Sequence, residues 1–154
     1  MRGDPAREHW QQPDPQGADR ARGLPVEGYA LIWDGHAAGL VGRNGSVDWL
    51  CLPRFDSGAC FAALLGTEEH GFWRIAPAGG AGRVARRYRG ETLVLETEFR
   101  TGDGVVRLVD CMPRRSDHAS VVRVVEGCLA GGDADGPGAP LRLRLGGAVD
   151  AMGR

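Results

Sequence analysis

Three aspartates that interrupt apolar stretches are the residues of this sequence with the clearest capacity for chemistry. Asp48 lies in Val-Asp-Trp-Leu-Cys-Leu, Asp56 follows Arg-Phe, and Asp110 lies in Leu-Val-Asp-Cys-Met. A carboxylate is costly to bury unless it is paired or hydrogen-bonded. The structural interpretation therefore pairs these aspartates with Arg54 or Arg43, or uses Asp56 as a helix cap.

A functional interpretation exists for the same segment, because carboxylates, arginines and indoles are also the groups that handle sugars. Hydrolysis of a glycosidic bond uses two carboxylates that flank it. Trp49 would stack on a pyranose ring while Arg54 and Asp56 hydrogen-bond to its hydroxyl groups. The candidate site residues are Asp48, Trp49, Arg54 and Asp56. Both interpretations remain open at this point.

Motifs of other enzyme classes are absent from the sequence. It contains no G-x-S-x-G elbow, phosphate-binding P-loop, H-E-x-x-H or dinucleotide-binding pattern. The histidines are far apart and the cysteines form no C-x-x-C pair. We therefore expect loop histidines, reduced buried cysteines, and neither a metal nor a cofactor. These residues are His9, His36, His70 and His118, and Cys51, Cys60, Cys111 and Cys128.

Composition and charge exclude further classes. Of the 154 residues, 25 are Gly and 9 are Pro, which favours many short strands joined by turns. The 19 basic residues, all arginine, are balanced by 20 acidic ones, so no basic field for nucleic acid exists, and we expect the arginines at 83–89 and 114–115 to be solvated. No apolar run reaches the ~18 residues of a membrane span, and the N-terminus lacks the apolar core of a signal peptide. We expect a cytoplasmic protein without nucleic-acid or membrane partners.

The elements that must position the candidate residues indicate an all-β fold, an antiparallel β-sandwich with one short helix. We expect residues 1–24 to be a disordered lead-in, because they are poor in apolar residues, and residues 25–154 to form the domain. Turn signals separate the strands at short intervals. The expected strands are 26–33, 39–43, 46–52, 72–76, 83–89, 91–100, 105–112, 121–126 and 141–145.

Local patterns refine this expectation at three places. Asn44-Gly45 predicts a tight hairpin with positive φ at both turn positions. Phe61, Leu64 and Leu65 share a helical face in 58–65, which Asp56 or Ser57 would cap and Gly66 would end. The strand that starts at Leu141 has no evident closing partner, so the sandwich looks interrupted and truncated there.

Alternation along two strands predicts which side chains point inward. Val47, Trp49 and Cys51 would share one face of their strand, with Asp48, Leu50 and Leu52 on the other. In the later strand, Leu93, Leu95, Thr97 and Phe99 would point inward, and Glu96, Glu98 and Arg100 outward.

The segment from Gly39 to Gly66 resembles the start of bacterial family 15 glycoside hydrolases, the glucoamylase-like and trehalase-like enzymes. The resemblance lies in Gly-Leu-Val-Gly-Arg-Asn-Gly-Ser-Val-Asp-Trp-Leu-Cys-Leu-Pro-Arg-Phe-Asp-Ser and Cys-Phe-Ala-Ala-Leu-Leu-Gly. It continues through Arg86-Arg-Tyr-Arg, Thr92-Leu-Val-Leu-Glu-Thr, Asp110-Cys-Met-Pro and Val122-Arg-Val-Val-Glu-Gly, and covers about residues 26–145.

The resemblance implies an N-terminal β-sandwich that precedes a helical (α/α)6 barrel. In the family the barrel carries the general acid and general base, which hydrolyse α-glucosides such as trehalose or maltooligosaccharides with inversion. No catalytic residue of the family falls on this chain, so the resemblance implies an inactive domain whose partner is the barrel, with the segment from Trp49 to Asp56 facing it. Two alternatives remain open. One is a stand-alone carbohydrate-binding or protein-interaction sandwich, with Trp33, Trp49, Phe72 and Trp73 as stacking surface; the other is a poorly folded fragment.

Overall fold

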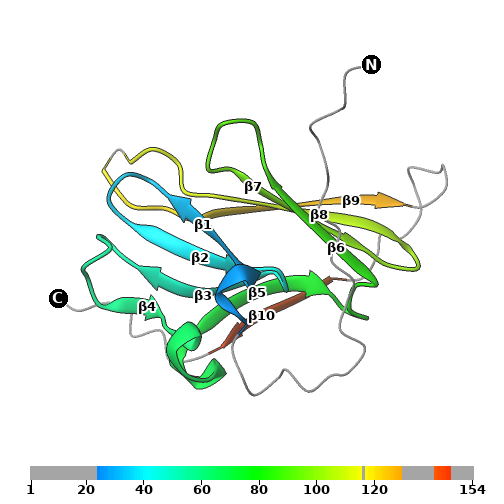
Figure 1. The fold of residues 1–154 in the computed structure, drawn as a ribbon, viewed down its shortest axis with the longest axis horizontal. Helices are drawn as coiled ribbons and strands as arrows, with labels where there is room; N and C mark the ends of the chain where they lie inside the picture. The colour runs from blue at the N-terminus through cyan, green and yellow to red at the C-terminus, as the bar shows by residue number, and fades with distance from the viewer. Residues whose placement is uncertain (1–23, 116, 130–140, 147–154) are drawn as a thin grey trace.

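The computed structural model describes residues 24–115, 117–129 and 141–146, which form two antiparallel β-sheets facing each other (Figure 1). This confirms the all-β sandwich. The expected disordered lead-in lies outside the described residues, apart from Leu24. Within the described ranges, no helix is long and apolar enough to cross a membrane.

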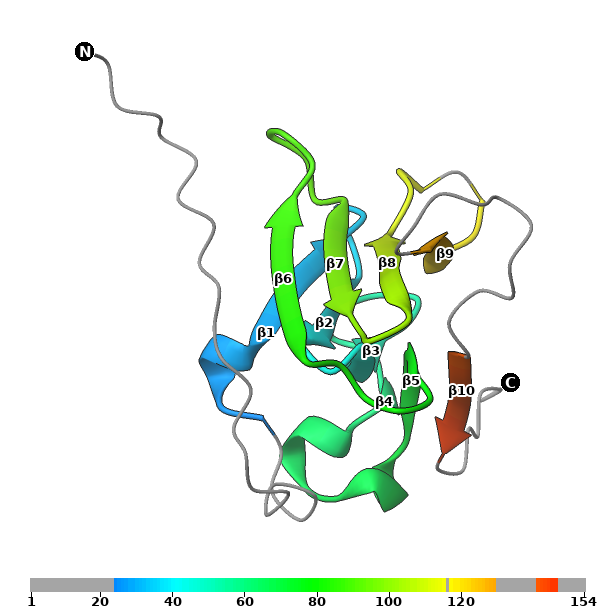
Figure 2. The ribbon, with the colours of Figure 1, turned by 90° about the vertical axis from the view of Figure 1, so that its right-hand side faces the viewer.

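We call the six-stranded sheet, with the order β1-β2-β3-β5-β10 and β4 paired to β3, sheet I. Its strands are β1 (Tyr29–Trp33), β2 (Ala38–Gly42), β3 (Ser46–Cys51), β4 (Ala59–Phe61), β5 (Phe72–Pro77) and β10 (Leu141–Gly146). Sheet II has the order β6-β7-β8-β9, and Figure 2 shows these strands from left to right in that order. Its strands are β6 (Arg83–Tyr88), β7 (Leu95–Arg100), β8 (Gly104–Cys111) and β9 (Val122–Leu129). Three single turns of 3-10 helix complete the described elements: η1 (Val26–Gly28), η2 (Ala63–Leu65) and η3 (Glu68–His70).

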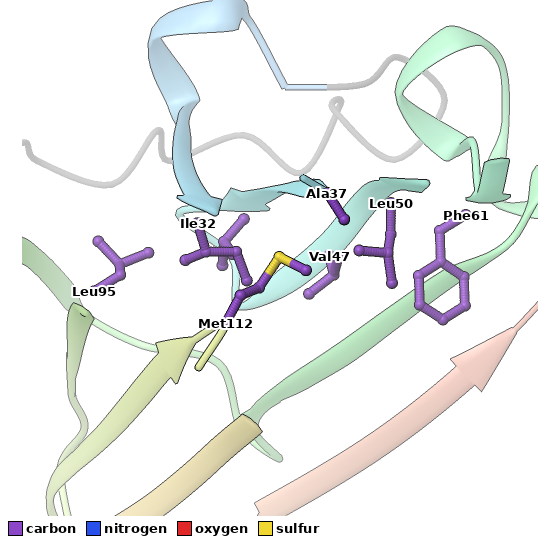
Figure 3. Close-up of a cluster of buried hydrophobic side chains, with 8 residues drawn as sticks. Ile32, Ala37, Val47, Leu50, Phe61, Leu95 and Met112 are labelled. Carbon is purple, nitrogen blue, oxygen red and sulfur yellow. The ribbon is translucent and has the colours of Figure 1, made fainter. Parts of the chain in front are cut away.

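The hydrophobic core lies between the sheets. Figure 3 shows Leu95 of β7 and Met112, the residue after β8, on the side of sheet II. They face Ile32, Val47 and Leu50 of sheet I. A second cluster centres on Phe99 and Leu108. Removing this apolar area from water stabilises the fold by about 25 cal/mol per Å². The inward positions 95, 97 and 99 of β7 are confirmed as buried, whereas the expectation for Leu93 is wrong, because β7 begins only at Leu95 and Leu93 lies in the preceding turn.

The helix expected over 58–65 is wrong. Ala59–Phe61 forms β4, in which Leu50 pairs with Phe61 and Cys51 with Ala59, and only the single turn η2 follows before Gly66. Phe61 enters the core while Leu65 is 75% exposed, so the two do not share a buried face. An isolated helix of this length is marginal, and the main-chain bonds that β3 offers outweigh the local periodicity.

The hairpin at Asn44-Gly45 is confirmed, but its turn differs from the expected one. Only Gly45 has positive φ, at 78°, and its N–H donates to Gly42 O at 2.9 Å. Asn44 Oδ1 accepts from Ser46 N at 3.1 Å. This is a longer loop in which a left-handed residue follows an ordinary turn, so positive φ is needed once.

A β-bulge at Asp48 overturns the alternation expected in β3. Leu40 pairs with Trp49 but Val41 pairs with Val47, which leaves Asp48 without a partner on β2. The bulge lets Val47 and Leu50, three positions apart, both enter the core. Strict alternation would have put them on opposite faces.

The last strand has a partner. β10 pairs with β5 over its whole length, from Leu141 opposite Pro77 to Gly146 opposite Phe72. The expectation of an unpaired end was wrong because the partner precedes it by more than sixty residues, and sequence spacing carries no sign of such a non-local pairing.

Ion pairs cover the outer face of sheet II across β6, β7 and β8. Glu96, although it points outward as expected, is only 5% exposed, because Arg87 Nε donates to it at 2.7 Å and Arg89 Nη2 at 2.5 Å. Arg107 bridges Glu98 at 3.0 Å and Glu126 at 3.3 Å. The hydrogen bonds from Arg89 and then Arg87 lower the pKa of Glu96 although burial opposes them.

Glu96→Gln is expected to flatten the acid limb of the pH dependence of the free energy of unfolding. Because the folded-state pKa is below the unfolded-state value, ionised Glu96 contributes stability that is present above about pH 5 and lost as pH falls through the folded-state pKa. Urea unfolding across acidic and neutral pH measures the slope. Replacing Arg87 and Arg89 together by Gln removes both guanidinium charges and should flatten the same limb. Identical slopes in wild type and both variants would contradict the assignment.

Candidate functional site

Asp48 is buried and its carboxylate is taken up by hydroxyl groups. Tyr29 Oη donates to Asp48 Oδ2 at 2.8 Å, and Ser46 Oγ donates to Oδ1 in a short hydrogen bond. Burial first, and then the hydrogen bond to Asp48, raise the pKa of Tyr29 well above its ordinary value. The expected pairing of Asp48 with Arg43 or Arg54 is therefore replaced by hydroxyl donors.

Trp49 lies on the outer face of sheet I. The register places Leu31, Leu40 and Trp49 side by side across β1, β2 and β3, and directly opposed residues share a face. Leu31 is exposed while its neighbour Ile32 is buried in the core, so this row points away from sheet II. The bulge at Asp48 is what turns Trp49 outward while Val47 and Leu50 pack inward.

Arg54 and Asp56 lie in the loop that follows β3. Arg54 Nε donates to Asp56 Oδ1 at 2.9 Å, and both side chains are more than half exposed. The hydrogen bond from Arg54 lowers the pKa of Asp56. Phe55 between them is 65% exposed. The expected pairing with Arg54 is confirmed for Asp56, whereas its helix-capping role is wrong because no helix follows.

A buried ion pair anchors this loop to the rest of the molecule. Asp34 Oδ1 accepts from the backbone N–H of His36 at 2.8 Å and of Ala37 at 2.7 Å, while Oδ2 accepts from Arg115 Nη2 at 2.9 Å. Arg115 also donates to Pro53 O, and Phe55 N donates to His36 O at 2.9 Å. Burial opposes ionisation of Asp34, but these donors hold its pKa below the ordinary value. The β1–β2 turn and the loop after β3 thus form one rigid end.

The third interrupting aspartate joins the two sheets. Asp110 and Arg123 have fully buried side chains, and Arg123 Nε donates to Asp110 Oδ1 at 2.7 Å. Arg123 also donates to Trp73 O at 2.6 Å and to Gly45 O at 2.8 Å, both in sheet I or its hairpin, and stacks over the Trp73 ring at 5.1 Å. Burial raises the pKa of Asp110 although Arg123 opposes it.

The arginines are more structural than expected. Arg86 donates to Val41 O at 3.1 Å between the sheets, and Arg115 is largely buried against Asp34, so the expectation of solvated clusters is wrong at both positions. Sequence reasoning also missed Tyr29, Asp34 and Arg123. Arg123 had a detectable signal, since it interrupts the apolar run Val-Val-Arg-Val-Val on an inward position.

The candidate residues thus do not assemble into one catalytic group. The structure brings Arg54 and Asp56 together, leaves Trp49 on the sheet face and holds Asp48 within the sheet. Among the described residues, no three His, Cys, Asp or Glu side chains group as metal ligands would. The arrangement defines a two-sheet β-sandwich with a rigid loop end and an aromatic face.

Comparisons with known proteins define the family. The model of the family "Trehalase-like, N-terminal" matches residues 16–132, and the chain belongs to this family. It is 36% identical over 88 residues to a trehalase of Mycobacterium tuberculosis, 38% over 98 residues to one of Thermoplasma volcanium and 34% over 85 residues to trehalase 2 of Sulfolobus acidocaldarius.

The matches cover a small part of these relatives. The alignments span 57%, 58% and 55% of this chain, but only 13%, 16% and 14% of the three trehalases in the same order. No solved structure matches significantly. Most of each relative's length therefore lies outside the region shared with this chain.

Proposed function

We propose that this chain is the non-catalytic N-terminal sandwich of a family 15 glycoside hydrolase, which hydrolyses α-glucosidic bonds of trehalose or maltooligosaccharides with inversion. The observation that carries the proposal is the match of residues 16–132 to the trehalase-like N-terminal family, with alignments confined to 13–16% of the trehalases. The catalytic carboxylates belong, in this proposal, to an (α/α)6 barrel that lies in the unshared part.

The buried carboxylates support a non-catalytic role. Inverting hydrolysis needs an acid and a base that face one bond across a gap wide enough for a water. Asp34, Asp48 and Asp110 are instead each engaged by donors of the fold itself, and Glu96 is held by two arginines. Such carboxylates contribute to stability, and these four supply no free acid–base pair in the interior of the described part of the chain.

The four candidate residues divide into two roles in this proposal. Trp49, Arg54 and Asp56 face the barrel or its substrate, because they lie on the outer face and on the loop beyond β3. Asp48 acts from within the sheet by holding the bulge that turns Trp49 outward. The proposal includes a cytoplasmic location, supported by the free thiols of Cys51, Cys60 and Cys111.

The purified chain is expected to release no glucose from trehalose or maltotetraose, since activation of water and protonation of the leaving group both need the missing pair. A coupled glucose assay with a full-length trehalase as positive control measures this. Turnover by the chain, lost on substitution of one of its own carboxylates, would overturn the proposal.

A stand-alone sugar-binding module is the second candidate, because Trp33 and Trp49 both lie on the outer face of sheet I. Phe72 is buried and Trp73 packs against both core clusters, so two of the four expected aromatics are core residues. Calorimetric titration of the same preparation with trehalose and maltooligosaccharides distinguishes the candidates. Saturable heat at millimolar sugar would favour the module.

A further inference from the structure

The outer face of sheet I and the adjoining loop end both carry exposed apolar side chains. Leu31 is 40% exposed, Trp33 is 47% exposed and Phe55 is 65% exposed. Leu40 and Trp49 are half-buried in the row beside Leu31. We call these five residues the apolar face. Leu31, Leu40 and Trp49 form one row in the strand register. The backbone hydrogen bond from Phe55 to His36, three residues after Trp33, brings the loop that carries Phe55 to the end of β1.

The two outer faces of the sandwich differ in chemistry. On the outer face of sheet II, Arg87, Arg89 and Arg107 pair with glutamates across β6–β8, which suits a surface in water, and the exposed apolar residues Val122 and Val124 are confined to β9. Across β1–β3 of sheet I, the described outward residues are mainly apolar, and the one carboxylate there, Asp48, is buried. An exposed apolar area rimmed by polar groups marks an interaction surface. Arg54 and Asp56 supply that rim at the loop end.

The apolar face is also held rigidly. Tyr88 Oη, reaching from β6 of sheet II, accepts from Leu31 N at 3.0 Å and donates to Leu31 O at 2.9 Å, which fixes the free edge of β1. The Asp34–Arg115 pair fixes the loop that carries Phe55. A surface that is ordered before binding loses little conformational entropy when it is covered.

We propose that the apolar face docks on the part of the trehalase polypeptide that the relatives carry beyond the shared region, with Trp33, the more exposed of its two indoles, as an anchor. This rests on the proposed function. The length of the relatives indicates what covers the apolar face. Between 84 and 87% of each compared trehalase lies outside the alignment, so in these proteins the shared sandwich is joined to a much larger part of the same polypeptide. Aromatic residues at the centre and charged residues at the rim are the usual composition of such an interface.

The test compares the 154-residue chain alone with a chimera in which it replaces the aligned region of the Mycobacterium tuberculosis trehalase. Hydroxyl-radical footprinting read by mass spectrometry reports how exposed individual side chains are. Trp33 and Leu31 should lose at least about fivefold in labelling in the chimera. Val124 on the outer face of sheet II, which is 46% exposed, is the matched control and should keep its labelling.

Trp33→Ser supplies an independent readout. In the chimera it should lower the midpoint of thermal unfolding or split the single transition into two, whereas Val124→Ser should leave one transition. The isolated chain should keep its own unfolding midpoint in both variants, because both side chains point outward from the core.

Each of the other outcomes contradicts either the docking face or the proposed function. An active chimera with unchanged labelling at Trp33, or with protection at Val124 instead, overturns the docking face and leaves the proposed function standing. A chimera that does not fold or does not hydrolyse trehalose counts against the proposed function, and the docking falls with it. Protection of Trp33 in a self-associated isolated chain, detected by sedimentation, assigns the face to a second copy and overturns the proposal.

Discussion

Gly45→Ala is expected to remove most of the stability of the sandwich. Gly45 has φ of 78°, which costs an L-residue about 1–2 kcal/mol. An added Cβ would also lie 2.1 Å from Ile75 O and 3.1 Å from Phe99 Cζ. Relief requires the hairpin to separate from β5, which breaks the bond from Ile75 N to Gly45 O. We expect the free energy of unfolding to fall by more than about 4 kcal/mol, a loss that single substitutions cause only when they severely disrupt the core.

Gly80→Ala is the matched control for this substitution. Gly80 has nearly the same φ, 80°, but apart from its two chain neighbours no described residue has an atom within 4 Å of the added Cβ. It should therefore show the backbone cost alone, about 1–2 kcal/mol. Urea unfolding of both variants measures the difference. Equal losses in the free energy of unfolding would mean that the close approach of Gly45 to β5 does not contribute to the effect of Gly45→Ala.

Arg123→Met is expected to be the second most damaging change. It leaves the Asp110 carboxylate buried without its partner and removes the donors to Trp73 O and Gly45 O. Removing one member of a buried pair typically costs about 3–5 kcal/mol. Because these bonds join sheet II to sheet I, we also expect weaker hydrogen-exchange protection of the β2–β3 hairpin.

A double substitution separates the ion pair from the packing. Asp110→Leu together with Arg123→Met replaces the pair by apolar groups, so it should be less damaging than the sum of the two single changes. Arg54→Met at the exposed Arg54–Asp56 pair is the control and should leave the unfolding midpoint unchanged. Additive losses at positions 110 and 123 would show that the two side chains do not stabilise each other.

Local signals predicted the elements well where turn chemistry and alternation agree. The hairpin at Asn44-Gly45 and the inward residues Leu95, Thr97 and Phe99 are present in the structure. They follow from glycine's access to positive φ and from the two-residue period of a strand. Both properties act over a few residues, so they are visible in the chain itself.

The errors have a common cause, which is competition from distant partners. The segment 58–65 has a helical apolar period, yet β3 supplies main-chain partners for Ala59–Phe61. The alternation in β3 fails because one extra residue, Asp48, is inserted opposite β2. β10 finds β5 only in three dimensions. In each case tertiary hydrogen bonding and burial outweigh a local preference of a fraction of a kcal/mol per residue.

For the candidate site, the sequence by itself determined the residue types and their family, and tertiary structure decided their roles. Asp48, Asp56 and Asp110 are alike as residues that interrupt apolar runs. In the fold, Asp48 accepts hydrogen bonds from Tyr29 and Ser46. Asp56 pairs with an exposed arginine, and Asp110 pairs with the buried Arg123. The cost of an unpaired carboxylate depends on burial and on the donors within reach, and strand pairing sets both. The outward turn of Trp49 likewise exists only because of the bulge beside it.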